Sequence, residues 1–176
     1  MEIEFVFKNS KNYLHGLGHI QSILKMSESL LKEEGLEIDR QLFKTAVYWH
    51  DVGRAILGEN ILTHVLDGPL SALIYLSKEK RSVFNWKTFW IIWNHTRLFY
   101  LLGSSVDRFL YRPTSLEEKV LWDLDLIDMI NPDREGLTKN TKLLLKGLVK
   151  TVSFKHFYFG YSQKLYWQYK KVIESA

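Results

Sequence analysis

Apolar residues recur every three or four positions along most of the chain, which is the spacing of one face of an α-helix. The first such stretch covers residues 17–34 and is followed by Gly35, a residue typical of helix C-termini. The second begins after Asp39, a good N-cap, and its apolar stripe runs into His50. Further helical stretches begin near residues 68, 86, 115, 138 and 160.

The helix expected after residue 115 has the clearest start signal. Ser115 and Glu118 have the spacing of a capping box, and the pattern ends before Pro132. Residues 2–7 alternate and fit a short strand, but a single strand forms no sheet. The sequence therefore predicts an all-α protein, with residues 1–176 forming one domain.

Composition narrows the chemistry. The chain has no cysteine, which excludes disulfides, zinc ribbons and thiol catalysis, so any metal must be bound by nitrogen and oxygen. The formal charge of +4 favours phosphate-bearing ligands but is too small and dispersed to indicate a nucleic-acid binder. No apolar run has the length of a membrane span, and the N-terminus lacks the pattern of a secretory signal. We therefore expect a cytoplasmic protein with no membrane contact.

His50 and Asp51 lie side by side where the second helix is expected to end. His50 continues the apolar stripe and should point inward, while Asp51 is rotated by about 100°. Both side chains reach one point only if that point lies beyond the helix terminus. Burial costs free energy unless each group has a partner. Three interpretations follow. The two residues form a hydrogen-bonded structural pair, in which Asp51 can instead pair with Arg54; they form a catalytic acid/base pair; or they share a cation.

Other ionisable residues fall on expected helices. Asp123, Asp125 and Asp128 lie among apolar residues, and Asp125 and Asp128 share a helix face. One or two of the three can face solvent, but we expect at least one to point into the core beside a positive partner. His15 and His19 have the i, i+4 spacing that can clamp a metal.

The order His19, His50–Asp51, Asp125 resembles that of the HD phosphohydrolase superfamily, whose members are helical, metal-dependent phosphatases and phosphodiesterases. The resemblance covers nearly the whole chain, through "HGLGHIQSIL", "AVYWHDVGR" and "EKVLWDLDLID". It implies an HD-type core of about five helices plus C-terminal helices. It also implies that His19, His50, Asp51 and Asp125 bind a divalent ion.

The resemblance leaves the number of metal ions open. In "DGPLSALIYL", Asp67 stands where two-metal members carry a histidine, and His64 lies one turn earlier. "IIWNHTR" matches the region that supplies another histidine, here His95. Either His64 or Asp67 binds a second ion together with His95, or the site holds one ion while His64 or His95 contacts phosphate.

A site of two histidines and two aspartates suits Mn, Fe, Co, Ni or Mg, and less distinctively Zn. Such an ion makes a nucleophilic water available near neutral pH. Asp51 is the residue expected to orient or deprotonate that water, and His95 can protonate the leaving oxygen. Arg54 and Arg97 are candidate phosphate clamps, with surface salt bridges as the alternative.

The leading hypothesis is a metal-dependent phosphohydrolase that cleaves a phosphate ester or anhydride of a small nucleotide. The alternatives are a phosphodiesterase or nuclease acting on RNA or DNA, and a non-catalytic HD nucleotide-binding module. Aromatic residues gather around His95, and we expect most of them in the core and some in a pocket that stacks a nucleobase. They are Trp86, Phe89, Trp90, Trp93, Phe99 and Tyr100.

Overall fold

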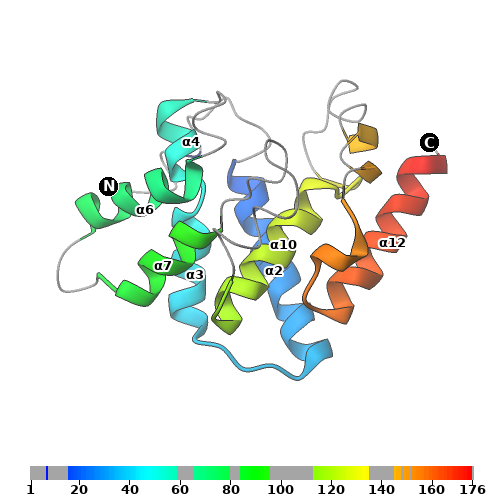
Figure 1. Ribbon diagram of the computed structural model, residues 1–176, viewed down its shortest axis with the longest axis horizontal. Coiled ribbons are helices and arrows are strands. Elements are labelled where there is room, and N and C mark those ends of the chain that lie inside the picture. Colours follow the sequence, from blue (N-terminus) through cyan, green and yellow to red (C-terminus); the bar gives the residue numbers. More distant parts are fainter. Residues whose placement is uncertain are drawn as a thin grey trace.

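The computed structural model describes residues 7, 16–58, 66–79, 84–95, 113–134, 145–147, 149, 150 and 152–175. Within these residues every regular element is helical and no strand is present, so the all-α prediction is confirmed (Figure 1). His15, His64 and Arg97 lie outside the described residues, as do Phe99 and Tyr100. The same holds for most of the strand expected at 2–7 and for the start of the helix expected near 138.

Seven α-helices and one 3-10 turn have described bounds. They are α2 (Leu17–Glu34), α3 (Arg40–Trp49), α4 (Val52–Leu57), α6 (Asp67–Lys78), α7 (Trp86–Asn94), α10 (Leu116–Met129), η1 (Phe154–His156) and α12 (Gly160–Ser175).

The expected helix ends are confirmed. Gly35 closes α2 in the left-handed conformation, with φ of 64°. The Asp39 side chain accepts from the Leu42 amide at 3.0 Å, which caps α3. Ser115 and Glu118 form both halves of a capping box at the start of α10.

The sequence pattern did not predict α4. α3 ends at Trp49, and after His50 and Asp51 this short helix begins at Val52. α4 packs closely on α6: a Cβ at Gly53 would lie 3.0 Å from Ser71 Oγ and 3.2 Å from Asp67 Oδ1. Glycine therefore allows the approach of the two helices.

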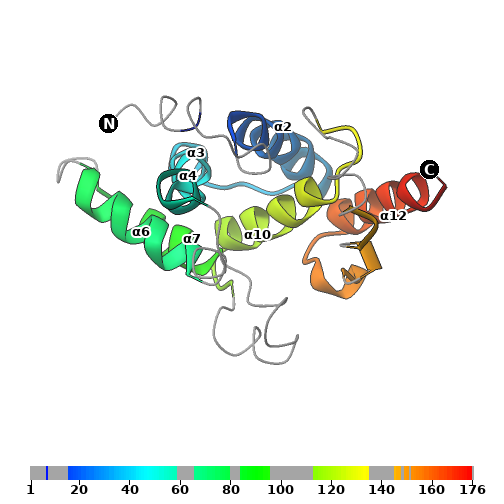
Figure 2. The ribbon, with the colours of Figure 1, turned by 90° about the horizontal axis from the view of Figure 1, so that it is seen from above.

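The helices surround one cluster of buried apolar side chains. α2 and α10 pack together in the centre, with α3, α6 and α7 on one side and α12 on the other (Figures 1 and 2). Ile20 and Ile23 of α2 and Leu121 and Leu124 of α10 are fully buried. No helix in the described part of the chain is long and apolar enough to cross a membrane.

The aromatic residues before His95 are less buried than expected. Phe89 packs in the core, but Trp86 is 61% and Trp90 50% exposed. α7 packs through the face that carries Thr88, Phe89 and Ile92, which leaves these two indoles on the other side. Of the six aromatics, Phe89 therefore lies in the core and Trp93 packs partly buried against it, whereas Trp86 and Trp90 lie outside it.

Candidate metal centre

The four residues proposed as metal ligands meet at the centre of the helices. α2 supplies His19, the break between α3 and α4 supplies His50 and Asp51, and α10 supplies Asp125. His19 Nε2 lies 3.2 Å from His50 Nε2, 3.2 Å from Asp125 Oδ1 and 3.4 Å from Asp51 Oδ2. All four side chains are buried. Packing therefore joins residues that are far apart in the sequence.

Each histidine of the site has one ring nitrogen held by an acceptor. Nδ1 of His19 lies 2.6 Å from Asp128 Oδ2, Nδ1 of His50 lies 2.7 Å from the Val47 carbonyl, and Nδ1 of His95 lies 2.6 Å from the Ile92 carbonyl. Because these oxygens accept hydrogen bonds, the proton of each ring belongs on Nδ1. The Nε2 atoms all face the cluster, where their lone pairs can bind a cation.

This arrangement suits a cation. The Nε2 atoms of His19 and His50 face each other at 3.2 Å, and two lone pairs at this distance need a proton or a positive ion between them. His19, His50 and Asp51 each offer one ligand atom, all within 4.8 Å of one another. Nitrogen and carboxylate oxygen together suit a divalent transition ion.

A second group of possible ligands adjoins the first. Asp51, Asp67 and His95 also bring one ligand atom each within 4.8 Å of one another. His95 Nε2 lies 3.7 Å from Asp51 Oδ1 and 3.5 Å from Asp67 Oδ2. This nitrogen is buried and has no hydrogen-bond partner among the residues that the structure describes. Asp51 thus belongs to both groups, with Oδ2 toward His19 and His50 and Oδ1 toward His95.

Asp67 is held on several sides. Ser71 donates to its Oδ1 at 3.1 Å, and the Gly53 amide donates to Ser71 Oγ at 2.8 Å. Arg54 Nε lies 2.7 Å from Asp67 Oδ2. Arg54 therefore forms a salt bridge, as one alternative expected, but the pair is largely buried and is not a surface contact.

All three aspartates of α10 are buried, which rules out the alternative that one or two of them face solvent. The expectation that at least one points into the core beside a positive partner is confirmed by Asp128. Asp128 meets His19 and also Arg134, whose Nη1 lies 3.2 Å from Asp128 Oδ2. Asp123 lies apart from the site and accepts the backbone amides of Tyr158 and Phe159 at 3.0 Å. Sequence reasoning missed Arg134, which lies beyond Pro132 and has no periodic signal.

In the metal-free protein, the charges of the cluster favour the protonated forms of His19, His95 and Asp67. Burial alone would lower the pKa of His19 and His95, but the surrounding carboxylates outweigh it. They raise the pKa of His19 well above its usual value and that of His95 to about 10. Burial and repulsion from Asp51 raise the pKa of Asp67 to about 6, although His95 and Arg54 oppose this.

Asp128 shifts the other way. Burial by itself would raise its pKa, but His19 and Arg134 lower the pKa below the usual value. Asp128 therefore stays ionised and keeps the proton of His19 on Nδ1. A divalent ion at the centre would replace the excess proton on Nε2.

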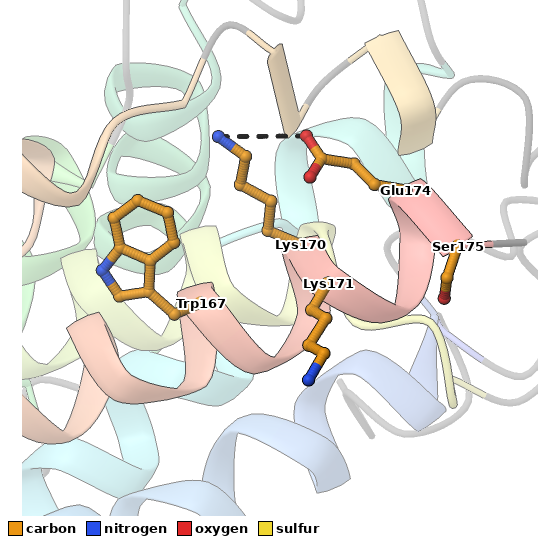
Figure 3. Close-up of a pocket in the computed structure, with 5 residues that line it drawn as sticks. All are labelled: Trp167, Lys170, Lys171, Glu174 and Ser175. Atoms are coloured by element: carbon orange, nitrogen blue, oxygen red, sulfur yellow. Dashed lines mark ion pairs between the residues drawn. The ribbon is translucent and has the colours of Figure 1, made fainter.

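A surface pocket of about 330 Å³ lies elsewhere, along the C-terminal half of α12. Trp167 and Lys170 line it on one side and Glu174 on the other, with Lys170 3.9 Å from Glu174 (Figure 3). None of the proposed ligands lines this pocket.

Comparison of the chain with protein-family models, with curated proteins and with solved structures found no match. The resemblance to HD phosphohydrolases thus remains a prediction from the residues themselves.

Proposed function

We propose that the chain is a metal-dependent phosphohydrolase of the HD type, which cleaves a phosphate ester or anhydride of a small nucleotide. One observation carries the proposal: Nε2 of His19 and His50 and oxygens of Asp51 and Asp125 converge in a buried cluster. A hydrogen-bonded structural pair explains His50 with Asp51 alone, but not the convergence of His19 and Asp125 on the same point.

His19, His50, Asp51 and Asp125 would hold the ion, which supplies Lewis acidity toward a phosphate oxygen and a nucleophilic water near neutral pH. Asp51 orients the attacking water and accepts its proton, because its two oxygens face different sides of the cluster. When a single ion is bound, His95 is placed to donate a proton to the leaving oxygen. Arg54 adds a positive charge for the phosphate.

The substrate class rests on the surroundings of His95. The chain carries a positive net charge, which favours phosphate. Trp93, two residues before His95, is only partly buried, and its ring packs 5.7 Å from that of Phe89. A partly buried indole on α7, the helix that ends just before His95, can stack a nucleobase.

The test is the Asp51→Asn variant, which keeps the shape of the side chain and removes both its charge and its ability to accept a proton. We expect hydrolysis of a generic phosphate ester, assayed with Mn, Ni, Co and Mg, to fall by about 10²–10⁴-fold. Asp39→Asn is the matched control: the same change at the other end of α3, where asparagine also caps a helix.

A folded Asp51→Asn protein with unchanged turnover and metal content would overturn the proposal. Hydrolysis of oligonucleotides in preference to mononucleotides would favour the nuclease alternative. Nucleotide binding without turnover under every metal would favour a non-catalytic module.

A further inference from the structure

The Arg54–Asp67 ion pair lies inside the second group of possible ligands. Asp67 Oδ2 contacts Arg54 Nε at 2.7 Å and His95 Nε2 at 3.5 Å, so the guanidinium and the imidazole meet the same oxygen. Asp67 is fully buried, and the Arg54 side chain is only 11% exposed. A second divalent ion at Asp51, Asp67 and His95 would compete with Arg54 for this oxygen.

The charges of the cluster favour one ion. Four carboxylates, of Asp51, Asp67, Asp125 and Asp128, face two guanidinium groups, of Arg54 and Arg134. With neutral imidazoles these described groups leave two net negative charges, which one divalent ion balances. A second ion would give the same described groups two net positive charges in a buried site, which is costly. A phosphate dianion carries the charge that removes this cost.

We propose that Arg54 is the resident counter-ion of Asp67 and makes the second divalent ion depend on phosphate. Arg54 keeps the affinity of Asp51, Asp67 and His95 for a second ion low until a phosphate group draws the guanidinium away from Asp67. The second ion and the phosphate then bind cooperatively. The inference rests on the proposed function, because it assumes that the first ion occupies His19, His50, Asp51 and Asp125.

Two further observations support this role. His95 Nε2 is buried, points between Asp51 and Asp67, and has no hydrogen-bond partner in the described part of the chain. Ser71, which accepts from the Gly53 amide, donates to the other oxygen of Asp67 and holds the carboxylate in place when Arg54 moves. Arg54 itself lies on the short helix α4, directly after Gly53 and at the edge of the cluster.

The experiment measures Mn²⁺ binding to the full chain by equilibrium dialysis, with and without inorganic phosphate. Manganese concentrations are kept low enough that manganese phosphate stays dissolved. We expect wild type to bind one ion tightly without phosphate, and a second ion about 5–150-fold more tightly with phosphate. Because coupling is reciprocal, the ion must raise the affinity for phosphate by the same factor.

Variants locate the coupling. Arg54→Met should bind the second ion without phosphate at least about tenfold more tightly than wild type, and should lose most of the phosphate effect. Arg54→Lys keeps the charge and should keep the phosphate dependence. Asp67→Asn should bind one ion under both conditions.

Arg134→Met is the matched control. It removes the other guanidinium, which contacts Asp128 and not Asp67. The phosphate dependence of the second ion should survive in this variant, which separates a local effect of Arg54 from an effect of total charge.

Three results would overturn the inference. One is two equally tight ions in wild type without phosphate. Another is a single ion in wild type and Arg54→Met under every condition. The third is an equal effect of Arg54→Met and Arg134→Met. Absence of any bound ion would overturn the proposed function as well, whereas one ion without coupling leaves that function standing.

Discussion

The histidines of the cluster depend on the charge around them. His19 and His95 are buried and each faces carboxylates, which stabilise the protonated rings in the metal-free protein. Under the proposed function, a cation would compete with these protons for the same Nε2 atoms. The stability of the metal-free protein and its affinity for metal should then both depend on pH.

Stability of the metal-free protein should fall as the pH rises above about 6.5. The pKa of His95 is about 10 in the folded protein and near 6.5 in the unfolded chain, so the folded state holds its proton longer. Its contribution is complete below pH 6.5 and is lost as the pH rises toward 10. His19, whose pKa is also raised, acts in the same direction.

Urea denaturation between pH 6.5 and pH 9.5, in the presence of a chelator, measures this effect. The free energy of unfolding should fall by up to about 1.4 kcal/mol per pH unit for each proton that the folded protein binds and the unfolded chain does not. His95→Gln should reduce the slope. With saturating Mn²⁺ the slope should shrink or reverse, because the ion binds the deprotonated rings. The same pH dependence of the free energy of unfolding with and without Mn²⁺ would contradict the proposal that the ion binds these histidine rings.

At the scale of elements, the break between α3 and α4 positions the site. His50 ends one helix and Asp51 precedes the next, so adjacent residues can direct side chains to one point. α4 then lies against α6 through Gly53, and this contact brings Arg54 to Asp67. Helix packing at one glycine thus determines the surroundings of Asp67.

Gly53→Ala should destabilise the protein by about 1–3 kcal/mol, the usual cost of overpacking. The new Cβ would press on Ser71 Oγ and Asp67 Oδ1 at 3.0 and 3.2 Å. Gly18→Ala is a matched control: Gly18 is also the second residue of its helix, but nothing lies within 4 Å of the place that an alanine methyl group would take there. Chemical denaturation compares the two. Equal stability of both variants would show that α4 and α6 can separate without cost.

At the scale of the whole molecule, the candidate metal centre joins three parts of the chain. α2, the α3–α4 junction and α10 each carry candidate ligands, and each also contributes side chains to the apolar core. An ion that binds only the folded arrangement stabilises the fold through mass action. The centre should therefore act as a cross-link between helices distant in sequence.

Mn²⁺ should raise the thermal midpoint, with about 2.7 kcal/mol of added stability at 100 times the dissociation constant. Asp125→Asn should lose this stabilisation because it removes a ligand oxygen. Asp123→Asn, two residues away on the same helix, should lower the midpoint but keep the shift on adding metal, since Asp123 binds backbone amides near α12. A metal-induced shift of equal size in both variants would exclude Asp125 as a ligand.

The sequence by itself determined the described helices other than α4 and the chemistry of possible ligands. Asp39, Ser115 and Gly35 mark helix ends through contacts within a few positions of the chain, so a local pattern suffices to find them. The lack of cysteine restricts ligands to nitrogen and oxygen. The inward direction of His50 also follows from helical periodicity, because it depends only on its place on α3.

Only the tertiary structure decided which distant groups meet. The partners of Asp67 and Asp128, namely Arg54 and Arg134, and the burial of all three aspartates of α10 depend on how separate helices pack. A sequence pattern shows that a carboxylate lies on an apolar helix, but not which donors surround it. Burial and pairing are set by contacts across the fold, where the loss of water makes each charge depend on its nearest neighbours.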